Sequence, residues 1–305
     1  MVKPSLRGEE LKVEAECLPC LLERGYKEAS YLTEDESLRI EALRRVLEML
    51  AENFRPEAYP AKLGTLRDRI IRSFFNGRDP YAGMKKESNR LALSLLPEAE
   101  AYVSKAEDAR GRFRRACLVA ALANALEFDV KDYDFNLEGF KLSLEDAAFS
   151  LDMVEEAYRL VKGGGPLLYL ADNAGEIVLD RVLVETLRRD FGAEVTLVVK
   201  GSPVLNDATL EDAEASGMAQ AASRIETIGD TVGLIWDEAP ENVKSDMKQA
   251  RLIIAKGMGN YEALTELEGA NLGLKVFFLL KAKCGPVARS LGVEKGSLVA
   301  MLKEL

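Results

Sequence analysis

The chain of 305 residues contains no histidine, only four cysteines and only two glutamines. Histidine is the commonest general base in enzymes and the commonest zinc ligand, so any catalysis here must use carboxylates, amides, lysine or cysteine. The scarcity of glutamine beside abundant Glu, Lys and Arg is typical of thermophilic proteins. The absence of histidine is the strongest constraint that composition places on the chemistry.

Long apolar runs and basic blocks are also missing. No apolar stretch reaches membrane-spanning length, and the first residues lack the apolar core of a signal peptide. The 41 basic and 51 acidic residues give a net charge of −10, which argues against a broad nucleic-acid-binding surface. We therefore expect a soluble cytoplasmic protein with no membrane or nucleic-acid partner, and no pattern specifies its oligomeric state.

Helical periodicity dominates the first half of the chain. Apolar residues recur at helical spacing over residues 38–50, 66–74, 84–96, 101–128 and 144–161. Pro56, Pro60 and Gly77 end the first two of these segments. No solenoid period and no low-complexity linker interrupts them. The pattern predicts an all-helical domain over residues 1–150.

After Gly163 the pattern changes to short apolar runs that alternate with helical segments. Strands are predicted at residues 167–171, 195–199, 225–228, 252–255 and 276–280. Such alternation is typical of a mainly parallel sheet covered by helices on both faces. The predicted class is therefore α/β, with the second domain over residues 151–305. Ligands of open α/β sheets bind at the carboxyl ends of the strands, so the site is expected there.

Hard oxygen ligands follow the first two predicted strands. Asp172 and Asn173 come directly after the first strand, and Asp207 lies in the loop after the second. Carboxylate and amide oxygens on neighbouring loops suit Mg²⁺ or Mn²⁺, which keep open positions for a phosphorylated substrate. The structural alternative is a helix cap at Asp172 and an Asx turn at Asn206. From the residues alone, both interpretations stay open.

Two further features bear on chemistry. The segment Lys256-Gly-Met-Gly-Asn260 places a cation and backbone N–H groups where phosphate oxygens can bind, although such a glycine turn can also be purely structural. Glu176 and Glu262 each begin a helix after a loop, as candidate bases or as acids favoured by the helix dipole. Neither a dinucleotide-binding glycine fingerprint nor a Walker loop follows the first strand.

Three motifs, in this order, resemble the damage-control phosphatase family, also called domain of unknown function 89. They are Leu-Ala-Asp172-Asn-Ala-Gly-Glu176, Lys200-Gly-Ser-Pro-Val-Leu-Asn-Asp-Ala208 and Lys256-Gly-Met-Gly-Asn-Tyr-Glu262. In the helical half, further segments are similar to the archaeal and bacterial branch: Cys17-Leu-Pro-Cys20, Asp79-Pro-Tyr81 with Lys85 and Asn89, and residues 120–128. The resemblance covers nearly the whole chain.

The resemblance implies a helical domain, a Rossmann-like αβα domain and dephosphorylation of small phosphorylated metabolites with a divalent metal, Mg²⁺, Mn²⁺, Co²⁺ or Ni²⁺. It implies Asp172, Asn173 and Asp207 as metal ligands and Lys256 as a phosphate contact. The substrate-binding residues expected on this basis are Asn124, Glu127, Lys200, Ser202, Gly257, Asn260 and Glu262. The family has aspartate where this chain has Glu127, which puts the role of that residue in doubt.

The predicted reaction is phosphomonoester hydrolysis, with Asp172, Asp207, Lys256 and Glu176 as catalytic residues. The metal and Lys256 neutralise charge on the phosphoryl oxygens while a water attacks, and its base is Asp207, Glu176 or Glu262. One rival is an S-adenosylmethionine-dependent carboxyl methyltransferase, for which Ala174-Gly-Glu176 is a poor cofactor loop. The other rival is a non-catalytic protein that binds phosphorylated metabolites.

The cysteines allow several interpretations. Cys17 and Cys20 have the spacing of metal or redox pairs, but a four-thiolate zinc site would also need Cys117 and Cys284, which lie in different predicted environments. We expect reduced structural thiols, with a disulfide or a metal-linked role as alternatives.

Overall fold

The computed structural model describes residues 10–124 and 137–305. Its centre is a seven-stranded sheet in the order β1-β7-β6-β5-β2-β3-β4. The strands are β1 (Phe149–Asp152), β2 (Gly165–Leu170), β3 (Ala193–Lys200), β4 (Arg224–Ile228), β5 (Leu252–Lys256), β6 (Lys275–Lys281) and β7 (Leu298–Glu304). Neighbouring strands are parallel except β6 and β7, which are antiparallel. The mainly parallel sheet confirms the predicted α/β class.

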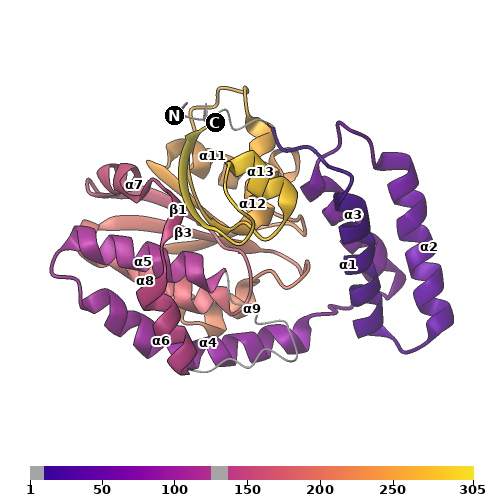
Figure 1. Ribbon diagram of the computed structural model, residues 1–305, viewed down its shortest axis with the longest axis horizontal. Coiled ribbons are helices and arrows are strands. Elements are labelled where there is room, and N and C mark those ends of the chain that lie inside the picture. The colour runs from indigo at the N-terminus through magenta and orange to yellow at the C-terminus, as the bar shows by residue number, and fades with distance from the viewer. Residues whose placement is uncertain (1–9, 125–136) are drawn as a thin grey trace.

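Helices cover both faces of the sheet (Figure 1). One face carries α5 (Ala109–Ala123), α7 (Val154–Val161) and α8 (Glu176–Phe191), and α4 (Ala82–Ser104) packs on α5 and α8. The other face carries α11 (Glu241–Gln249), α12 (Gly257–Leu264) and α13 (Gly285–Leu291). Alternate residues of β2 enter the two cores, Leu167 and Tyr169 in the first and Leu168 and Leu170 in the second. Because β2 is buried on both faces, its sequence is a continuous apolar run rather than an alternation of apolar and polar residues.

Short elements complete the described part of the chain. They are α6 (Leu137–Asp146), α9 (Leu210–Ala215), α10 (Met218–Ala221) and the 3₁₀ turns η1 (Trp236–Glu238) and η2 (Thr265–Leu267).

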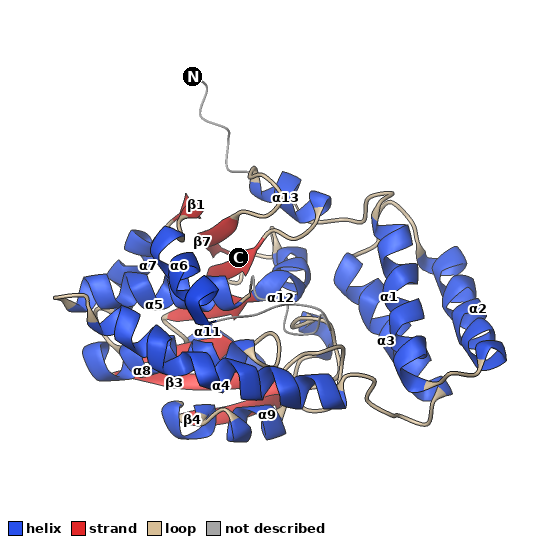
Figure 2. Ribbon diagram, turned by 60° about the horizontal axis from the view of Figure 1, so that its bottom comes forward, coloured by secondary structure: helices blue, strands red, loops and turns tan. Residues whose placement is uncertain are grey.

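Three helices stand beside the sheet as a separate unit (Figures 1 and 2). They are α1 (Cys17–Leu32), α2 (Glu36–Asn53) and α3 (Pro60–Phe74), and they share an apolar core of their own. Asp35 caps α2 by accepting hydrogen bonds from the N–H groups of Ser37 and Leu38. The unit reaches the rest of the molecule mainly through α3, which packs against α12. We call it the α1–α3 unit.

The five predicted strands are confirmed, but two predicted helical segments are wrong. Residues 144–161 form the end of α6, strand β1 and helix α7, because the four residues from Phe149 alternate in burial and pair with β7. Residues 101–128 do not form one helix, because α4 runs through Pro97 to Ser104 and α5 begins after the cap at Asp108. The last residues of that segment, 125–128, lie outside the described residues.

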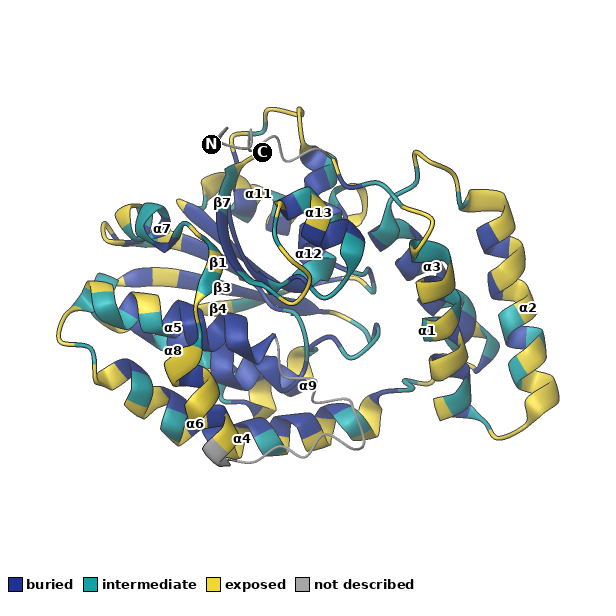
Figure 3. Cartoon of the chain, in the orientation of Figure 1, coloured by how far each residue is buried: buried dark blue, intermediate teal, exposed yellow. Residues whose placement is uncertain are grey.

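Burial follows these layers (Figure 3). Every residue of β5 is buried, whereas the outer side of α2 is open to solvent and exposes Ile40 and Leu47. No helix in the described ranges is long and apolar enough to cross a membrane.

Candidate active site

The predicted site residues meet at the carboxyl ends of the central strands of the sheet. Strand β2 pairs in parallel with both β3 and β5. When this register is extended two residues past Leu170, Asp172 comes level with Lys200 on one side and Gly257 on the other. The carboxyl ends of the central strands therefore gather the loops in which the sequence placed its ligands, as expected for an open α/β sheet.

The loops after β2 and β3 are joined to each other. The N–H of Ala208 donates a hydrogen bond to the carbonyl of Asp172 at 2.8 Å. An antiparallel bridge pairs Asn173 with Asp207. The three residues predicted as metal ligands thus lie side by side on two loops that hold each other in place.

The backbone at the start of α12 approaches Asp172 very closely. Gly257 has a φ of +75°, and a Cβ at this position would overlap the Asp172 carboxylate. Residues other than glycine rarely adopt such a φ, so both the conformation and the space demand glycine. The first N–H groups of α12, which have no partner inside the helix, therefore start next to this carboxylate.

Asn124, at the end of α5, connects the helical half to the site. Its Nδ2 donates to Asp172 Oδ2 at 2.9 Å and to both carboxylate oxygens of Glu176 at 3.0 Å. Its Oδ1 accepts a hydrogen bond from the N–H of Lys281 at 2.9 Å, which fixes the orientation of the amide. A single buried side chain thus connects α5, the loop after β2, α8 and the end of β6.

Asn173 points its amide nitrogen toward two carboxylates. Its Nδ2 donates to Asp172 Oδ2 at 2.9 Å and to Glu176 Oε1 at 2.6 Å. No hydrogen bond from the described residues reaches its Oδ1. The oxygen that would bind a metal is therefore available.

Lys256 lies in the protein interior at the end of β5. Its side chain is 0 % exposed, and its Nζ lies 2.6 Å from Asp180 Oδ1 and 3.4 Å from Glu176 Oε2. Burial acts to lower the pKa of Lys256, but the carboxylates outweigh it and raise that pKa. Asp180 was missed by the sequence analysis. The available signal was a carboxylate one helical turn after Glu176, directly after the apolar residues 177–179 of the helix.

Lys200 is the second buried lysine. Its Nζ donates to the carbonyl of Gly233 at 3.1 Å and lies 3.5 Å from Asp207 Oδ2. Burial lowers the pKa of Lys200, and burial raises the pKa of Asp207 to about 6 although Lys200 opposes this shift. Lys200 therefore holds Asp207 in position, although burial disfavours the charged form of both side chains.

Negative charge is in excess around Asp172. Burial raises the pKa of this carboxyl well above its ordinary range, and the charges of Glu176 and Asp207 raise it further. The positive charges of Lys283 and Lys256 act in the opposite direction. A carboxyl group whose ionised form is disfavoured by its neighbours is a position where a bound cation would be stabilised.

The donor set fits a hard divalent cation. Asp172 and Asp207 offer carboxylate oxygens and Asn173 offers its amide oxygen, all ligands that Mg²⁺ and Mn²⁺ accept. In the described ranges no three acidic or thiol side chains come together as a metal site. The set is therefore two carboxylates with one amide, which leaves coordination positions open.

The other predicted residues lie at different distances from this centre. Asn260 fixes the start of α12, because its Nδ2 donates to the carbonyls of Ala171 at 3.1 Å and Lys256 at 2.8 Å. Ser202 is half-buried in the loop after β3. Glu127 lies outside the described residues.

Glu262 lies in a separate environment. Burial raises its pKa to about 7, and the charge that opposes this shift belongs to Arg67 of α3. The charge of Glu262 in turn acts on the thiols of Cys17 and Cys284. Among the described residues, the opposing charge that acts on Glu262 therefore comes from α3 and not from the cluster around Asp172.

Helix α3 contributes a boundary of the site that sequence analysis missed. Asp68, which is 0 % exposed, accepts a hydrogen bond from the N–H of Leu205 at 3.2 Å, in the loop that carries Asp207. Arg72 lies 2.6 Å from both Asp68 and Asp230, and Arg69 lies 2.7 Å from Asp230. We call the contacts of Arg69 and Arg72 with Asp230 the α3–β4 seam. Only charged residues on an amphipathic helix could have signalled it.

The cysteines are free thiols. Cys117 is a fully buried residue of α5, and burial raises its pKa well above the ordinary value. Cys284 precedes α13. Burial raises the pKa of its thiol to about 11, and the nearby Cys17 and Cys20 at the start of α1 act in the same direction.

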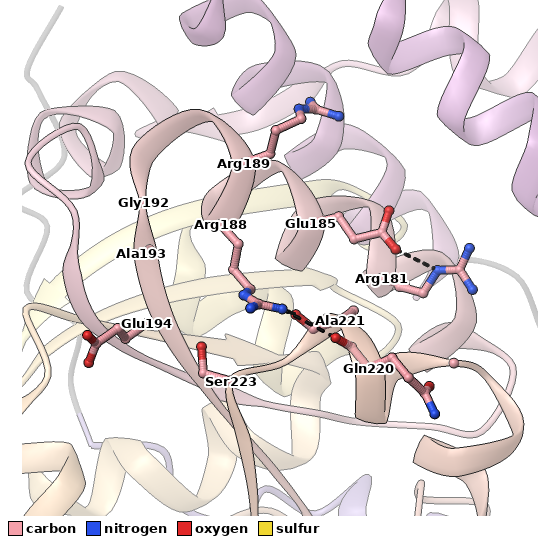
Figure 4. A pocket seen from close by; sticks show the side chains of 11 residues that line it. Arg181, Glu185, Arg188, Arg189, Gly192, Ala193, Glu194, Gln220, Ala221 and Ser223 are labelled. Atoms are coloured by element: carbon pink, nitrogen blue, oxygen red, sulfur yellow. Dashed lines mark hydrogen bonds and ion pairs between the residues drawn. The ribbon is translucent and has the colours of Figure 1, made fainter.

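A cavity of about 850 Å³ lies away from this centre, between the last turns of α8, the start of β3 and α10 (Figure 4). Its arginines already have partners: Arg181 contacts Glu185, and Arg188 donates to the carbonyls of Gln220 and Ala221 (Figure 4). This cavity is at the opposite end of the strands from Asp172. We therefore place the candidate site at the sheet edge, where the carboxylates converge.

Comparison with known proteins gives a consistent result. A family model described as the damage-control phosphatase ARMT1-like domain matches residues 13–299. A damage-control phosphatase of Archaeoglobus fulgidus is 35 % identical over 96 % of this chain and 100 % of the relative. A damage-control phosphatase of Pyrococcus horikoshii is 32 % identical over 95 % of this chain and 98 % of the relative.

The fold agrees with a solved structure of the same kind. The crystal structure of a DUF89 family protein from Pyrococcus horikoshii superimposes with a TM-score of 0.84 at 31 % identity. The match covers 95 % of this chain and 99 % of that chain.

Proposed function

The chain belongs to the damage-control phosphatase ARMT1-like family, and on this basis we propose that it hydrolyses phosphomonoesters of small phosphorylated metabolites with a divalent metal. The observation that carries the proposal is the bridge between Asn173 and Asp207, beside Asp172. It is a backbone pairing that brings together the two loops that carry Asp172, Asn173 and Asp207, at the carboxyl ends of the strands where open α/β sheets bind ligands.

The metal site would consist of Asp172, Asn173 and Asp207. A bound Mg²⁺, Mn²⁺, Co²⁺ or Ni²⁺ would supply Lewis-acid polarisation of the phosphoryl oxygens. The excess of negative charge at Asp172 and Asp207 supports this assignment, because a cation there would relieve the repulsion between the carboxylates.

The residues around this set have complementary tasks. Glu176 and Asn124 orient Asn173 and Asp172 through hydrogen bonds, and the Lys256 ammonium offsets the charge of Glu176. The first N–H groups of α12 face the position where phosphoryl oxygens would lie. Attack of water on phosphorus breaks the ester P–O bond, and the departing alkoxide takes up a proton. Asp207 and Glu176 are the candidates for accepting the proton of the attacking water.

The alternatives are less well supported. A carboxyl methyltransferase would need a glycine-rich loop for its cofactor after β2, and that position holds Asp172 and Asn173 bonded to the neighbouring loop. A protein that only binds phosphorylated metabolites would release no phosphate from them, with or without a metal. Metal-dependent turnover therefore separates the phosphatase from both rivals.

We predict that phosphate release from a panel of phosphomonoesters depends on added metal and is lost in Asp172→Ala. The protein is first treated with a chelator and then assayed with Mg²⁺, Mn²⁺, Co²⁺ or Ni²⁺. Removal of a carboxylate ligand is expected to lower kcat/KM at least about 100-fold. Asp237→Ala, at an exposed acid of η1, is the matched control and should keep parental activity.

Retained activity in Asp172→Ala would remove the proposed metal site. Absence of phosphate release with every metal, in a protein that binds those metals, would remove the proposed reaction.

A further inference from the structure

Three of the four cysteines lie at the junction between the α1–α3 unit and the sheet, outside the candidate site. Cys17 and Cys20 belong to the first turn of α1, and Cys284 is the residue directly before α13. The fourth, Cys117, is a fully buried residue of α5. None of the three thiols at the junction is a proposed ligand of metal or phosphate, so the proposed function does not account for them.

Contacts between side chain and backbone hold the start of α1 against α13. Arg289 of α13 forms an ion pair with Glu16, the residue before Cys17. The Glu16 carboxylate also lies against Gly285, where a Cβ would come within 2.5 Å of Glu16 Oε1. Gly285 directly follows Cys284. The first turn of α1 and the residue before α13 therefore face each other across the junction.

The spacing of Cys17 and Cys20 suits a disulfide within α1. Residues i and i+3 of an α-helix have Cα atoms about 5 Å apart, and disulfides join Cα atoms about 4.4–6.8 Å apart. The Cβ atoms, about 5–6 Å apart at this spacing, must approach to about 4 Å. The first turn can tighten in this way because its N–H groups have few partners inside the helix, and Pro19 has no N–H at all.

The two thiols of α1 differ in their access to solvent. Cys20 is exposed, whereas Cys17 is half-buried. The N–H of Glu14 donates to Cys17 Sγ at 3.4 Å, and burial raises the pKa of the Cys17 thiol. The apolar core of the α1–α3 unit takes Leu21 from this turn but not Cys20. Packing therefore gives no reason for a cysteine at position 20, and an external reagent meets Cys20 before Cys17.

From this geometry we propose that Cys17 and Cys20 form a redox-active dithiol site whose substrate is an external low-molecular-weight disulfide, RSSR. The Cys20 thiolate attacks one sulfur of RSSR, which forms a mixed disulfide and releases the first RS⁻. The Cys17 thiolate then attacks the sulfur of Cys20, and the second RS⁻ leaves. The two protein thiols are oxidised to one disulfide, RSSR is reduced to two thiols, and the two protons of the protein thiols pass to the released RS⁻ groups.

Cys284 is the competing partner for either thiol of α1. It packs against the apolar core beneath α11, α12 and α13, and it belongs to the sheet side of the junction. The separation of Cys17 and Cys20, in contrast, is set by a single helical turn. The pair within α1 is therefore the one that the geometry favours.

The test is disulfide mapping after the native protein has been equilibrated with mixtures of oxidised and reduced glutathione. Free thiols are then alkylated, and peptide masses identify the cysteines that are linked. We expect a bond between Cys17 and Cys20 that forms and disappears reversibly with the glutathione ratio, while Cys117 and Cys284 remain free thiols. In the reduced protein, alkylation of Cys20 should be about tenfold or more faster than that of Cys17.

Three variants separate a dithiol site from two unrelated thiols. In Cys17→Ser, the mixed disulfide between Cys20 and glutathione should accumulate to at least about tenfold its level in the parent, because no second thiol displaces the glutathione. Cys20→Ser should form no disulfide within α1. Cys284→Ser is the matched control, since it removes the neighbouring thiol and keeps the pair, and its oxidation should follow the parental curve. Thermal unfolding of each reduced variant shows that it is folded.

Each other outcome overturns the proposal. A mixed disulfide that persists on Cys20 of the parent, with Cys17 still free, would show two unrelated thiols, and thiols that stay reduced at every glutathione ratio would show no redox site. A bond to Cys284 would link the α1–α3 unit to the sheet and exclude the pair within α1. The proposal is independent of the proposed function, because none of these readouts requires phosphate release.

Discussion

Two groups of ion pairs flank the candidate site, and they differ in burial. Between α8 and β5, the side chains of Lys256 and Asp180 are 0 % exposed and lie 2.6 Å apart. At the α3–β4 seam, Arg69 and Asp230 lie 2.7 Å apart, but their side chains are 35 % and 25 % exposed. The distances are nearly equal, so burial is what distinguishes the two groups.

The comparison shows that one kind of interaction has two physical roles. A buried pair has lost its hydration, and removal of one partner leaves an uncompensated charge in the interior. A partly exposed pair exchanges its partner for water at little cost. The pair between Lys256 and Asp180 therefore fixes the floor of the site, whereas the seam joins the α1–α3 unit to the sheet by contacts that are easily broken.

The largest expected effect is on the buried side. Asp180→Ala should lower the free energy of unfolding by about 3–5 kcal/mol, because it leaves the Lys256 ammonium buried with only Glu176 at 3.4 Å. Chemical denaturation of the metal-free protein measures this change. The double variant Asp180→Leu with Lys256→Met removes both charges, so it should recover part of the lost stability.

The experiment on Asp180 also tests the comparison itself. If Asp180→Ala costs no more than about 1 kcal/mol, the buried pair behaves like a surface pair and the distinction based on burial fails.

The overall fold followed largely from hydrophobic pattern. Strands β2, β3, β5 and β6 are mostly apolar, buried on both faces and bounded by glycine or charged residues, which is a strong signal. Strand β4 is mostly exposed or half-buried and gives a weaker one. The two missed strands lie at or near one edge of the sheet, and β1 has only four residues that alternate in burial. A four-residue edge strand is too short to outweigh the helical pattern on either side of it, so only its pairing with β7 defines it.

The candidate site could be predicted only in part. The residues at strand ends were found because parallel topology brings strand ends together, and the bridge between Asn173 and Asp207 agrees with that reasoning. Asp180 and Asp68 were missed because each lies inside a helix, where sequence gives no indication of which partner a charged side chain meets. The position of Glu262 depends on how α12 packs against α3, and local pattern contains no information about that packing.

A smaller effect is expected at the close approach of α12 to Asp172. Gly257→Ala places a methyl group on the carboxylate and forces alanine into a φ of +75°. We expect a loss of about 1–3 kcal/mol in the free energy of unfolding. Because the displaced carboxylate is a proposed metal ligand, kcat/KM should fall at least about 100-fold.

Gly269→Ala is the matched control for this variant. Gly269 has a similar φ of +79°, but a Cβ there would meet no atom within 4 Å. It should show the conformational strain alone, with parental kcat/KM. Equal activities of the two alanine variants would contradict the close approach of α12 as a feature of the active site.

The smallest effect is expected at the α3–β4 seam. Asp230→Asn removes the charge that Arg69 and Arg72 share, but Arg69 keeps Glu238 at 2.6 Å and Arg72 keeps Asp68 at 2.6 Å. Since each arginine retains a carboxylate and the seam is partly hydrated, the free energy of unfolding should fall by less than about 1 kcal/mol.

Added salt should reduce the difference in unfolding free energy between parent and variant further. Dissolved ions screen partly exposed charges, with a Debye length of about 10 Å at 0.1 M. Denaturation at low and high NaCl measures both effects, and Asp180→Ala under the same conditions should show a loss that salt barely changes. A salt-independent loss of several kcal/mol in Asp230→Asn would place the seam with the buried pairs, and the α1–α3 unit would then be as firmly joined to the sheet as Lys256 is to Asp180.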